Sequence, residues 1–240
     1  MEQDKTFSSS KLVLDVEQQI KELLPSLPKT LEGTITEMAF YEGFWCFSNL
    51  SGAVISFQRC FQAQDTDLII ASNPKSVSLW HHYHEMGLYN NGEMSMEDFF
   101  DVYFEGVSWY GPYWDHVLGY WKESLEKPNK VLFLKYEDMK KDIVSCLKRI
   151  AEFIGYPFSR EEDRDGVIEE IVKLCSLSNL KNLEVNIEGM YLGKVPNKSY
   201  FRKGKVGEWV DYLSPSKKKH LENVMQEKLR GSGLSFKLSI

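Results

Sequence analysis

The spacing of apolar and polar positions along the chain predicts a mainly helical protein with a few short strands. Between residues 11 and 24, apolar side chains recur at a ragged helical period, and Pro25 and Pro28 predict that this helix ends there. Similar spacing and helix-end signals, among them a capping box after Ser95 and Gly155 as a helix stop, predict further helices. These are expected at 78–85, from 95 onward, and at 112–125, 143–154, 161–175 and 215–230.

Two short apolar runs, 67–71 and 131–134, are typical of buried parallel strands. The aromatic-rich stretch 38–61 has no clear period, so we expect irregular structure there. Residues 1–10 are polar and predict a disordered tail. No internal repeat or linker is visible, so the pattern predicts one α/β domain over 11–240, with a parallel sheet flanked by helices.

The composition is that of an ordinary globular domain. The 240 residues are 42% apolar and 27% charged, enough for one hydrophobic core. A formal net charge of −6 argues against nucleic-acid binding, which usually needs a basic face. An aromatic content of 13% favours a pocket for a ring-bearing ligand, although it fits core packing equally well.

The four cysteines, at 46, 60, 146 and 175, show no C-x-x-C spacing, and the chain shows no secretory leader. No apolar run is long enough to span a membrane. We therefore expect a cytoplasmic protein with reduced thiols and no membrane partner.

The segment 200–209, Tyr-Phe-Arg-Lys-Gly-Lys-Val-Gly-Glu-Trp, carries the strongest chemical signal. Arg202 and Lys203 are adjacent, so two long cationic side chains are able to close on one anion. Gly204 and Gly207 allow close backbone approach and offer unhindered N–H donors. The alternative is a solvated surface turn, because basic residues beside glycine are common in turns.

This segment resembles the Arg-Lys-Gly-x-x-Gly-Asp-Trp signature of the cytosolic sulfotransferases, with Glu208 in place of aspartate. The resemblance implies that it grips the 3′-phosphate of the co-substrate 3′-phosphoadenosine 5′-phosphosulfate (PAPS). Other stretches are similar to further blocks of the family, most of all its plant branch acting on flavonols and hydroxyjasmonates. They are 57–75, 78–86, 110–120 and 131–140.

The same resemblance indicates an internal deletion near 75–78. The family carries a long region between its phosphate loop and the block that begins here at Val77-Ser78. That region holds a Gly-Thr-Thr-Trp sequence, the catalytic histidine and an arginine for the 3′-phosphate. The implied fold is therefore the P-loop-like sulfotransferase fold with central elements missing.

Further site residues follow from the resemblance. Lys75 and Ser76 match the start of the phosphate loop for the 5′-phosphosulfate, and Lys75 is the one candidate catalytic residue left, although a solvated lysine is an alternative. Ser78 matches a serine that binds the 3′-phosphate, or else caps the next helix. Tyr136 matches a tyrosine near the adenosine, or else is a core residue. Ser176 and Leu177 loosely match adenine contacts.

The run His81-His82-Tyr83-His84-Glu85 suggests zinc at first sight. It lacks a fourth ligand and the i, i+4 spacing of a helical zinc pair, so we expect no metal. A nucleophile–histidine–aspartate triad has no motif here either.

The resemblance implies sulfonate transfer from PAPS to a hydroxyl of a small, phenolic or otherwise hydroxylated acceptor, by an impaired or inactive enzyme. One alternative is a non-catalytic binding protein that uses an aromatic pocket of residues 109, 110, 113, 114 and 121. Another is a mis-spliced or wrongly assembled product that does not fold stably. The stretch 210–219 does not match the family's dimerisation element, so we expect no dimer through it.

Overall fold

The computed structural model describes residues 18–30, 37–62, 67–70, 76–85, 94–108, 110–191 and 195–236. The chain divides into two units by its backbone contacts. Unit 1 comprises residues 1–74 and 88–116, and unit 2 comprises 75–87 and 117–240. The predicted tail, 1–10, lies outside the described residues, and the single domain over 11–240 stays a prediction.

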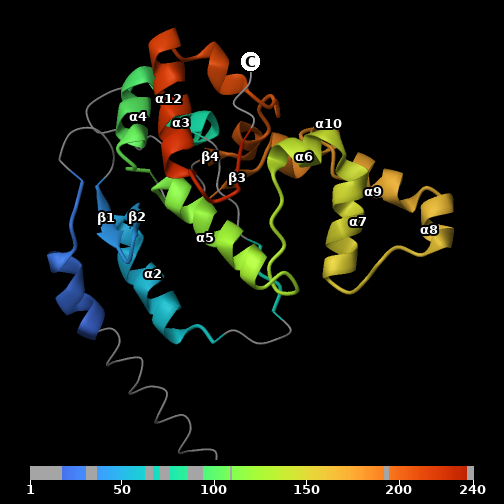
Figure 1. The fold of residues 1–240 in the computed structure, drawn as a ribbon, viewed down its shortest axis with the longest axis horizontal. Coiled ribbons are helices and arrows are strands. Elements are labelled where there is room, and N and C mark those ends of the chain that lie inside the picture. Colours follow the sequence, from blue (N-terminus) through green and yellow to red (C-terminus); the bar gives the residue numbers. More distant parts are fainter. Residues whose placement is uncertain are drawn as a thin grey trace, which may run out of the picture. The chain divides into compact units, whose positions relative to one another are not determined.

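Unit 1 contains a β-hairpin followed directly by a helix. β1 (Met38–Tyr41) and β2 (Phe44–Phe47) pair antiparallel, with the first residue of β1 opposite the last of β2. Glu42 and Gly43 join them with φ of 45° and 92°, the left-handed conformations that a tight two-residue hairpin turn requires. α2 (Ser48–Cys60) contacts both strands (Figure 1).

The prediction of irregular structure over 38–61 is therefore wrong. Strands of four residues are too short to display an alternating pattern, and β1 is buried on both faces, which hides the alternation further. Ile55 of α2 is fully buried and packs with Ile20 and Tyr41. Burial of these apolar side chains, rather than local periodicity, fixes this part of the chain.

The remaining helices of unit 1 follow the sequence pattern. Residues 18–23 are helical and pass into the short 3₁₀ helix η1 (Leu24–Ser26), which Pro25 helps to begin. α4 (Met96–Phe104) begins after Ser95, whose side chain accepts a hydrogen bond from the backbone N–H of Asp98. The predicted cap at Ser95 is confirmed.

Unit 2 is mainly helical. Its helices are α3 (Ser76–Glu85), α6 (Tyr136–Lys141), α7 (Ile143–Phe153), α8 (Arg160–Arg164), α9 (Val167–Leu174), α10 (Leu177–Leu180), α11 (Glu184–Ile187), η2 (Asn197–Tyr200), η3 (Glu208–Asp211) and α12 (Pro215–Lys228). α5 (Tyr113–Glu126) begins in unit 1 and continues in unit 2. No helix in the described part of the chain is both long and apolar enough to cross a membrane.

Most of the predicted helices are confirmed, with one correction. The helix expected over 161–175 is divided into α8 and α9, because Gly166 adopts a left-handed φ of 78° between them. Gly155, also left-handed, follows the end of α7 as expected. Pro215 opens α12 directly after Ser214.

The two predicted strands are wrong for the residues that the structure describes. Residues 67–70 and 131–134 belong to no strand, and the sheets of the described ranges are two antiparallel pairs, β1–β2 and β3 (Met190–Tyr191) with β4 (Val195–Pro196). An extended segment becomes a strand only when a neighbour accepts its backbone hydrogen bonds. Leu68, Ile69 and Ile70 are 63%, 66% and 87% exposed, so this apolar segment lacks the cover that a buried strand has.

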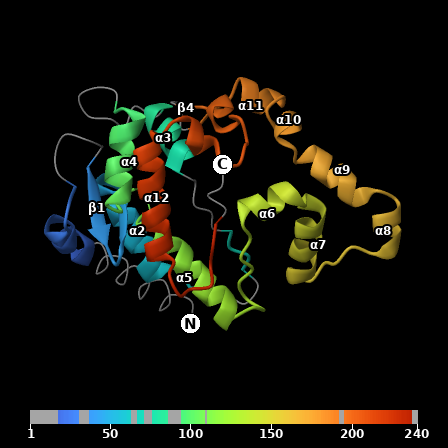
Figure 2. The same cartoon turned by 45° about the horizontal axis from the view of Figure 1, so that its top comes forward.

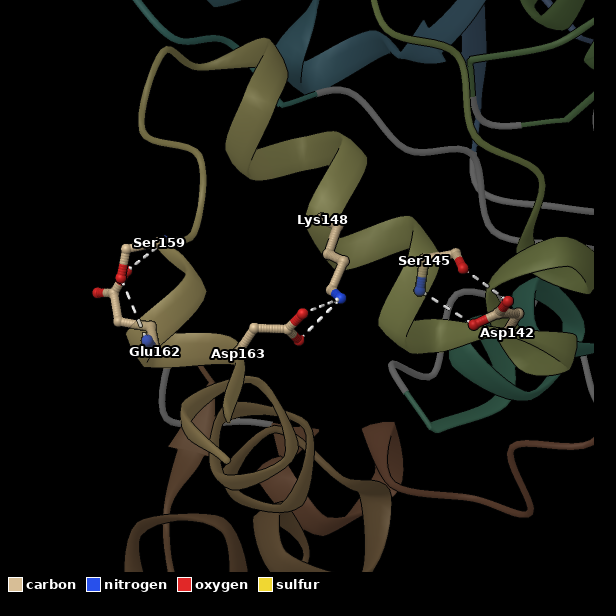
Figure 3. Close-up of polar contacts among 6 residues, drawn as sticks. All are labelled: Asp142, Ser145, Lys148, Ser159, Glu162 and Asp163. Carbon is tan, nitrogen blue, oxygen red and sulfur yellow. Dashed lines mark hydrogen bonds and ion pairs between the residues drawn. The ribbon is translucent and has the colours of Figure 1, made fainter. Parts of the chain in front are cut away.

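α7, α8 and α9 pack together at one side of unit 2 (Figure 2). Ser159 caps α8 reciprocally: its Oγ accepts from the Glu162 N–H at 3.1 Å, and its own N–H donates to Glu162 Oε2 at 2.7 Å. Asp163 of α8 pairs with Lys148 of α7 at 2.8 Å (Figure 3). Asp142 caps α7 by accepting from the Ser145 N–H at 3.0 Å.

The capping box at Ser159 predicts that Ser159→Ala lowers the stability of the protein measurably. We expect the free energy of unfolding to fall by about 1 kcal/mol, because the backbone N–H of Glu162 loses its acceptor at the start of α8. Urea titration followed by circular dichroism measures this. Ser214→Ala is the matched control, because Ser214 is also an N-cap residue but makes no side-chain capping bond. Equal losses in the two variants would contradict the prediction.

The histidines of α3 predict that stability falls at acidic pH. Burial lowers the pKa of both His81 and His82 below the ordinary 6.5, and Arg202 lowers the pKa of His81 further. Below about pH 6.5 these two histidines bind protons more readily in the unfolded chain than in the folded chain. Their contribution to stability is therefore fully present above this pH and is lost as the pH falls below it.

The measurement is the urea midpoint at about pH 7.5 and about pH 5.5. His81→Gln with His82→Gln should reduce the drop between the two values. Leu79→Val, a packing change at a buried position of the same helix, should lower both midpoints alike. A drop of unchanged size in the histidine variant would refute this assignment.

Candidate functional site

The loop between η2 and η3 carries Arg202, Lys203 and Gly204. Gly204 has a φ of 59°, and a Cβ built there would lie 2.7 Å from Cδ2 of Leu177. A left-handed conformation costs an L-residue about 1–2 kcal/mol, so glycine is favoured on both grounds. The loop therefore lies close to the start of α10, a contact that a side chain at 204 would push apart.

One carboxylate oxygen accepts hydrogen bonds from the two cations of this loop and from a tyrosine that follows η3. Oε1 of Glu208 accepts from Arg202 Nη2, from Lys203 Nζ at 3.3 Å and from the Tyr212 hydroxyl at 3.2 Å. The side chains of Arg202 and Glu208 are only 22% and 10% exposed. Hydrogen bonds with Tyr212 and then Glu208 raise the pKa of Lys203, which therefore stays a cation.

Two buried nitrogen atoms next to this network have no hydrogen-bond partner among the described residues: Arg202 Nη1 and His81 Nε2. A buried donor without a partner costs about 1–3 kcal/mol, more when it is charged. The His81 ring meets the Tyr212 ring edge to face at 6.0 Å, and α3 contacts both η2 and η3. The free Arg202 nitrogen is the kind of donor that an anionic ligand satisfies.

Tyr136 joins the same loop from α6. Its hydroxyl donates to the carbonyl oxygen of Gly204 at 3.1 Å, and its pKa is raised by burial. The side chain is 40% exposed, so Tyr136 is not the fully buried core residue that was the alternative. Leu177 also lies against Gly204, and Ser176 caps α10 by accepting from the Asn179 N–H. Tyr136 and Leu177 thus meet at Gly204.

The structure gives less about the other predicted residues. Lys75 lies outside the described residues, and so does the side chain of Ser76, which begins α3. Ser78 is exposed inside α3, so it is not the N-cap of this helix. It stands three residues before His81 and thus on the same helix face.

The sequence left the roles of Glu208 and Tyr212 unassigned. The signature identifies Glu208 only as a substitution for aspartate, and the stretch 210–219, which contains Tyr212, does not match the family's dimerisation element. The available signal was their spacing of four residues, which brings two side chains together on a helical turn. Among the described residues, no group of three or more histidine, cysteine or acidic side chains is suited to hold a metal ion.

The aromatic residues of the alternative binding pocket belong to different units. Trp109 lies outside the described residues, and Tyr113, in unit 1, packs against Tyr103 with ring centroids 6.2 Å apart. Trp121, in unit 2, packs edge to face on Phe133 and donates its indole N–H to the Ser232 carbonyl oxygen. Each of these rings has a packing role within its own unit.

This chain is similar to known proteins in sequence and in fold. The sulfotransferase domain family matches residues 65–233. Cytosolic sulfotransferase 15 of Arabidopsis thaliana is 32% identical over 315 residues, which cover 92% of this chain and 88% of the relative. Flavonol 4′-sulfotransferase of Flaveria chlorifolia is 50% identical over 163 residues, covering 67% of this chain and 51% of the relative.

A mouse sulfotransferase solved in complex with PAP superposes with a TM-score of 0.54 at 29% identity, covering 65% of this chain and 55% of the mouse protein. The chain thus spans about half the length of the Flaveria and mouse proteins. The Arabidopsis alignment is at least 75 positions longer than the 240 residues of this chain, which fits an internal deletion. The mixed helix and strand content agrees with the expected α/β sulfotransferase fold. The chain belongs to the sulfotransferase family.

Proposed function

We propose that this chain binds the adenosine and 3′-phosphate end of PAPS, and of PAP, the nucleotide left after sulfonate transfer. The observation that carries this proposal is the buried, unpartnered Nη1 of Arg202, in a loop that also presents Lys203. A phosphate would supply acceptors for both cations at once. The mouse relative solved with PAP supports the same ligand class.

Each predicted residue has a role in this proposal. Arg202, Lys203 and the backbone of Gly204 hold the 3′-phosphate, with Ser78 contributing its hydroxyl from α3. Tyr136 lies beside the adenosine, since its hydroxyl is already fixed on the Gly204 carbonyl. Lys75 and Ser76 are what remains of the loop for the 5′-phosphosulfate.

Sulfonate transfer to a hydroxyl needs a base for the acceptor's proton and cations for the charge that develops on the leaving phosphate. The family's base and its phosphate loop fall in the region that this chain lacks by resemblance. Loss of a general base alone costs about two to four orders of magnitude in rate. We therefore infer that this chain retains nucleotide binding, and that sulfonate transfer by it is impaired or absent.

The acceptor, where one binds, is proposed to be a small phenolic or otherwise hydroxylated molecule, because the Flaveria relative is named for a flavonol. The Arabidopsis relative is named cytosolic, and we propose a cytosolic location, with no metal, nucleic acid or membrane involved.

Calorimetry of the 240-residue chain with PAP tests the proposal. We expect weak binding that is lost when Arg202 and Lys203 are both changed to alanine, because each charge-assisted hydrogen bond contributes about 1.5–3 kcal/mol. Lys122→Ala together with Lys219→Ala is the charge-matched control, because both lysines are exposed and lie outside the loop. It should bind PAP as the unmodified chain does.

Turnover is measured in parallel with PAPS and simple phenols. We expect no sulfonated product above background. Rapid sulfonation by this chain would rule out the impaired enzyme, and failure of PAP to bind at any practical concentration would rule out the proposed function.

A further inference from the structure

We propose that Glu208 is a positioning residue for the anion site: it holds one nitrogen of Arg202 so that the other, Nη1, stays free for an incoming phosphate. The proposal rests on the proposed function. The two terminal nitrogens of the guanidinium differ in their contacts. Nη2 donates to Glu208 Oε1, while Nη1 is buried and has no hydrogen-bond partner among the described residues. A guanidinium held at one side presents its remaining donors in a fixed direction.

Glu208 is not displaced when an anion arrives. Its side chain is 10% exposed, and its Oε1 also accepts from the Tyr212 hydroxyl. If the phosphate broke the pair with Arg202, the Glu208 carboxylate would stay in its largely buried position without its cation, which is strongly unfavourable. The phosphate therefore adds to the network rather than replacing the carboxylate.

Lys203 is held more weakly than Arg202 and is able to change its anionic partner. Its side chain is 52% exposed, and its contacts with Glu208 and Tyr212 are both long, at 3.3 Å. Such a lysine is able to turn to a new anion at small cost. One cation is thus mostly buried and held by the carboxylate, and its neighbour is half exposed and more weakly held.

The carboxylate is itself held in place. Gly207, with a left-handed φ of 79°, begins η3, and this turn sets Glu208 and Tyr212 four residues apart on one side. The Tyr212 ring packs against His81 of α3. Arg202 is thereby connected through Glu208 and Tyr212 to His81 of α3, a residue far earlier in the chain.

The experiment compares Glu208→Gln with Glu208→Asp by calorimetry with PAP. Glutamine keeps the shape but replaces a charge-assisted bond with a weaker neutral one, so we expect the Kd for PAP to rise roughly three- to tenfold. Aspartate keeps the charge, so it should restore the affinity to within about threefold of the unmodified chain. Glu222→Gln removes a partly exposed carboxylate on α12, outside the loop, and should leave the Kd unchanged.

A second readout needs no nucleotide. In protein labelled with ¹⁵N-arginine, the side-chain signals of Arg202, assigned with Arg202→Lys, should report restricted rotation in the unmodified chain and in Glu208→Asp. They should show free rotation in Glu208→Gln. A merely structural role would lower the melting temperature without releasing Arg202.

The outcomes are distinct. Tighter PAP binding in Glu208→Gln would show that the carboxylate competes with the phosphate and would overturn the proposal. So would an unchanged Kd, or an Arg202 that stays restricted in this variant. Absence of PAP binding in the unmodified chain would instead overturn the proposed function, and this inference with it.

Discussion

Two cationic side chains at consecutive positions repel each other, and the candidate site depends on the carboxylate that offsets this repulsion. Glu208 accepts from both Arg202 and Lys203, and its own position depends on the Tyr212 hydroxyl. With a net charge of −6, the chain offers an anionic ligand no general attraction. Any affinity for an anion must come from this local arrangement, in which a mostly buried arginine is oriented by Glu208 and the neighbouring lysine is half exposed.

Much of the helical structure could be predicted from the sequence because its signals are local. A capping serine at 95 and the Ser214-Pro215 pair act within a single turn, so they determine helix starts wherever the helix then packs. Strands depend on a neighbour that may be distant in the sequence. The hairpin of β1 and β2 was missed, and 131–134 was taken for a strand, because pairing is not encoded in four residues.

The candidate site divides in the same way. Arg202, Lys203 and Gly204 could be identified from adjacency alone, since their types and order already suggest an anion site. Tyr136 is 68 positions from Gly204, and only a family resemblance suggested that they belong together. The role of Glu208 could not be predicted, because it depends on the η3 turn that brings it and Tyr212 to Arg202 and not on any property of the signature itself.

Ligand binding and catalysis place different demands on such a chain. The 3′-phosphate and the adenosine do not react, so contacts with them are equally strong in the ground state and in the transition state. Such contacts lower the Kd without accelerating the chemical step. Acceleration requires groups at the transferring sulfonate: a base at the acceptor and donors at the bridging oxygen. In the proposed function, the described residues around Arg202 bind only the 3′-phosphate and adenosine end of the nucleotide, and the Arabidopsis relative has a longer sequence than this chain. A protein that loses the groups around the transferring sulfonate, but keeps those around the 3′-phosphate and adenosine, loses the rate of transfer before it loses affinity for the nucleotide.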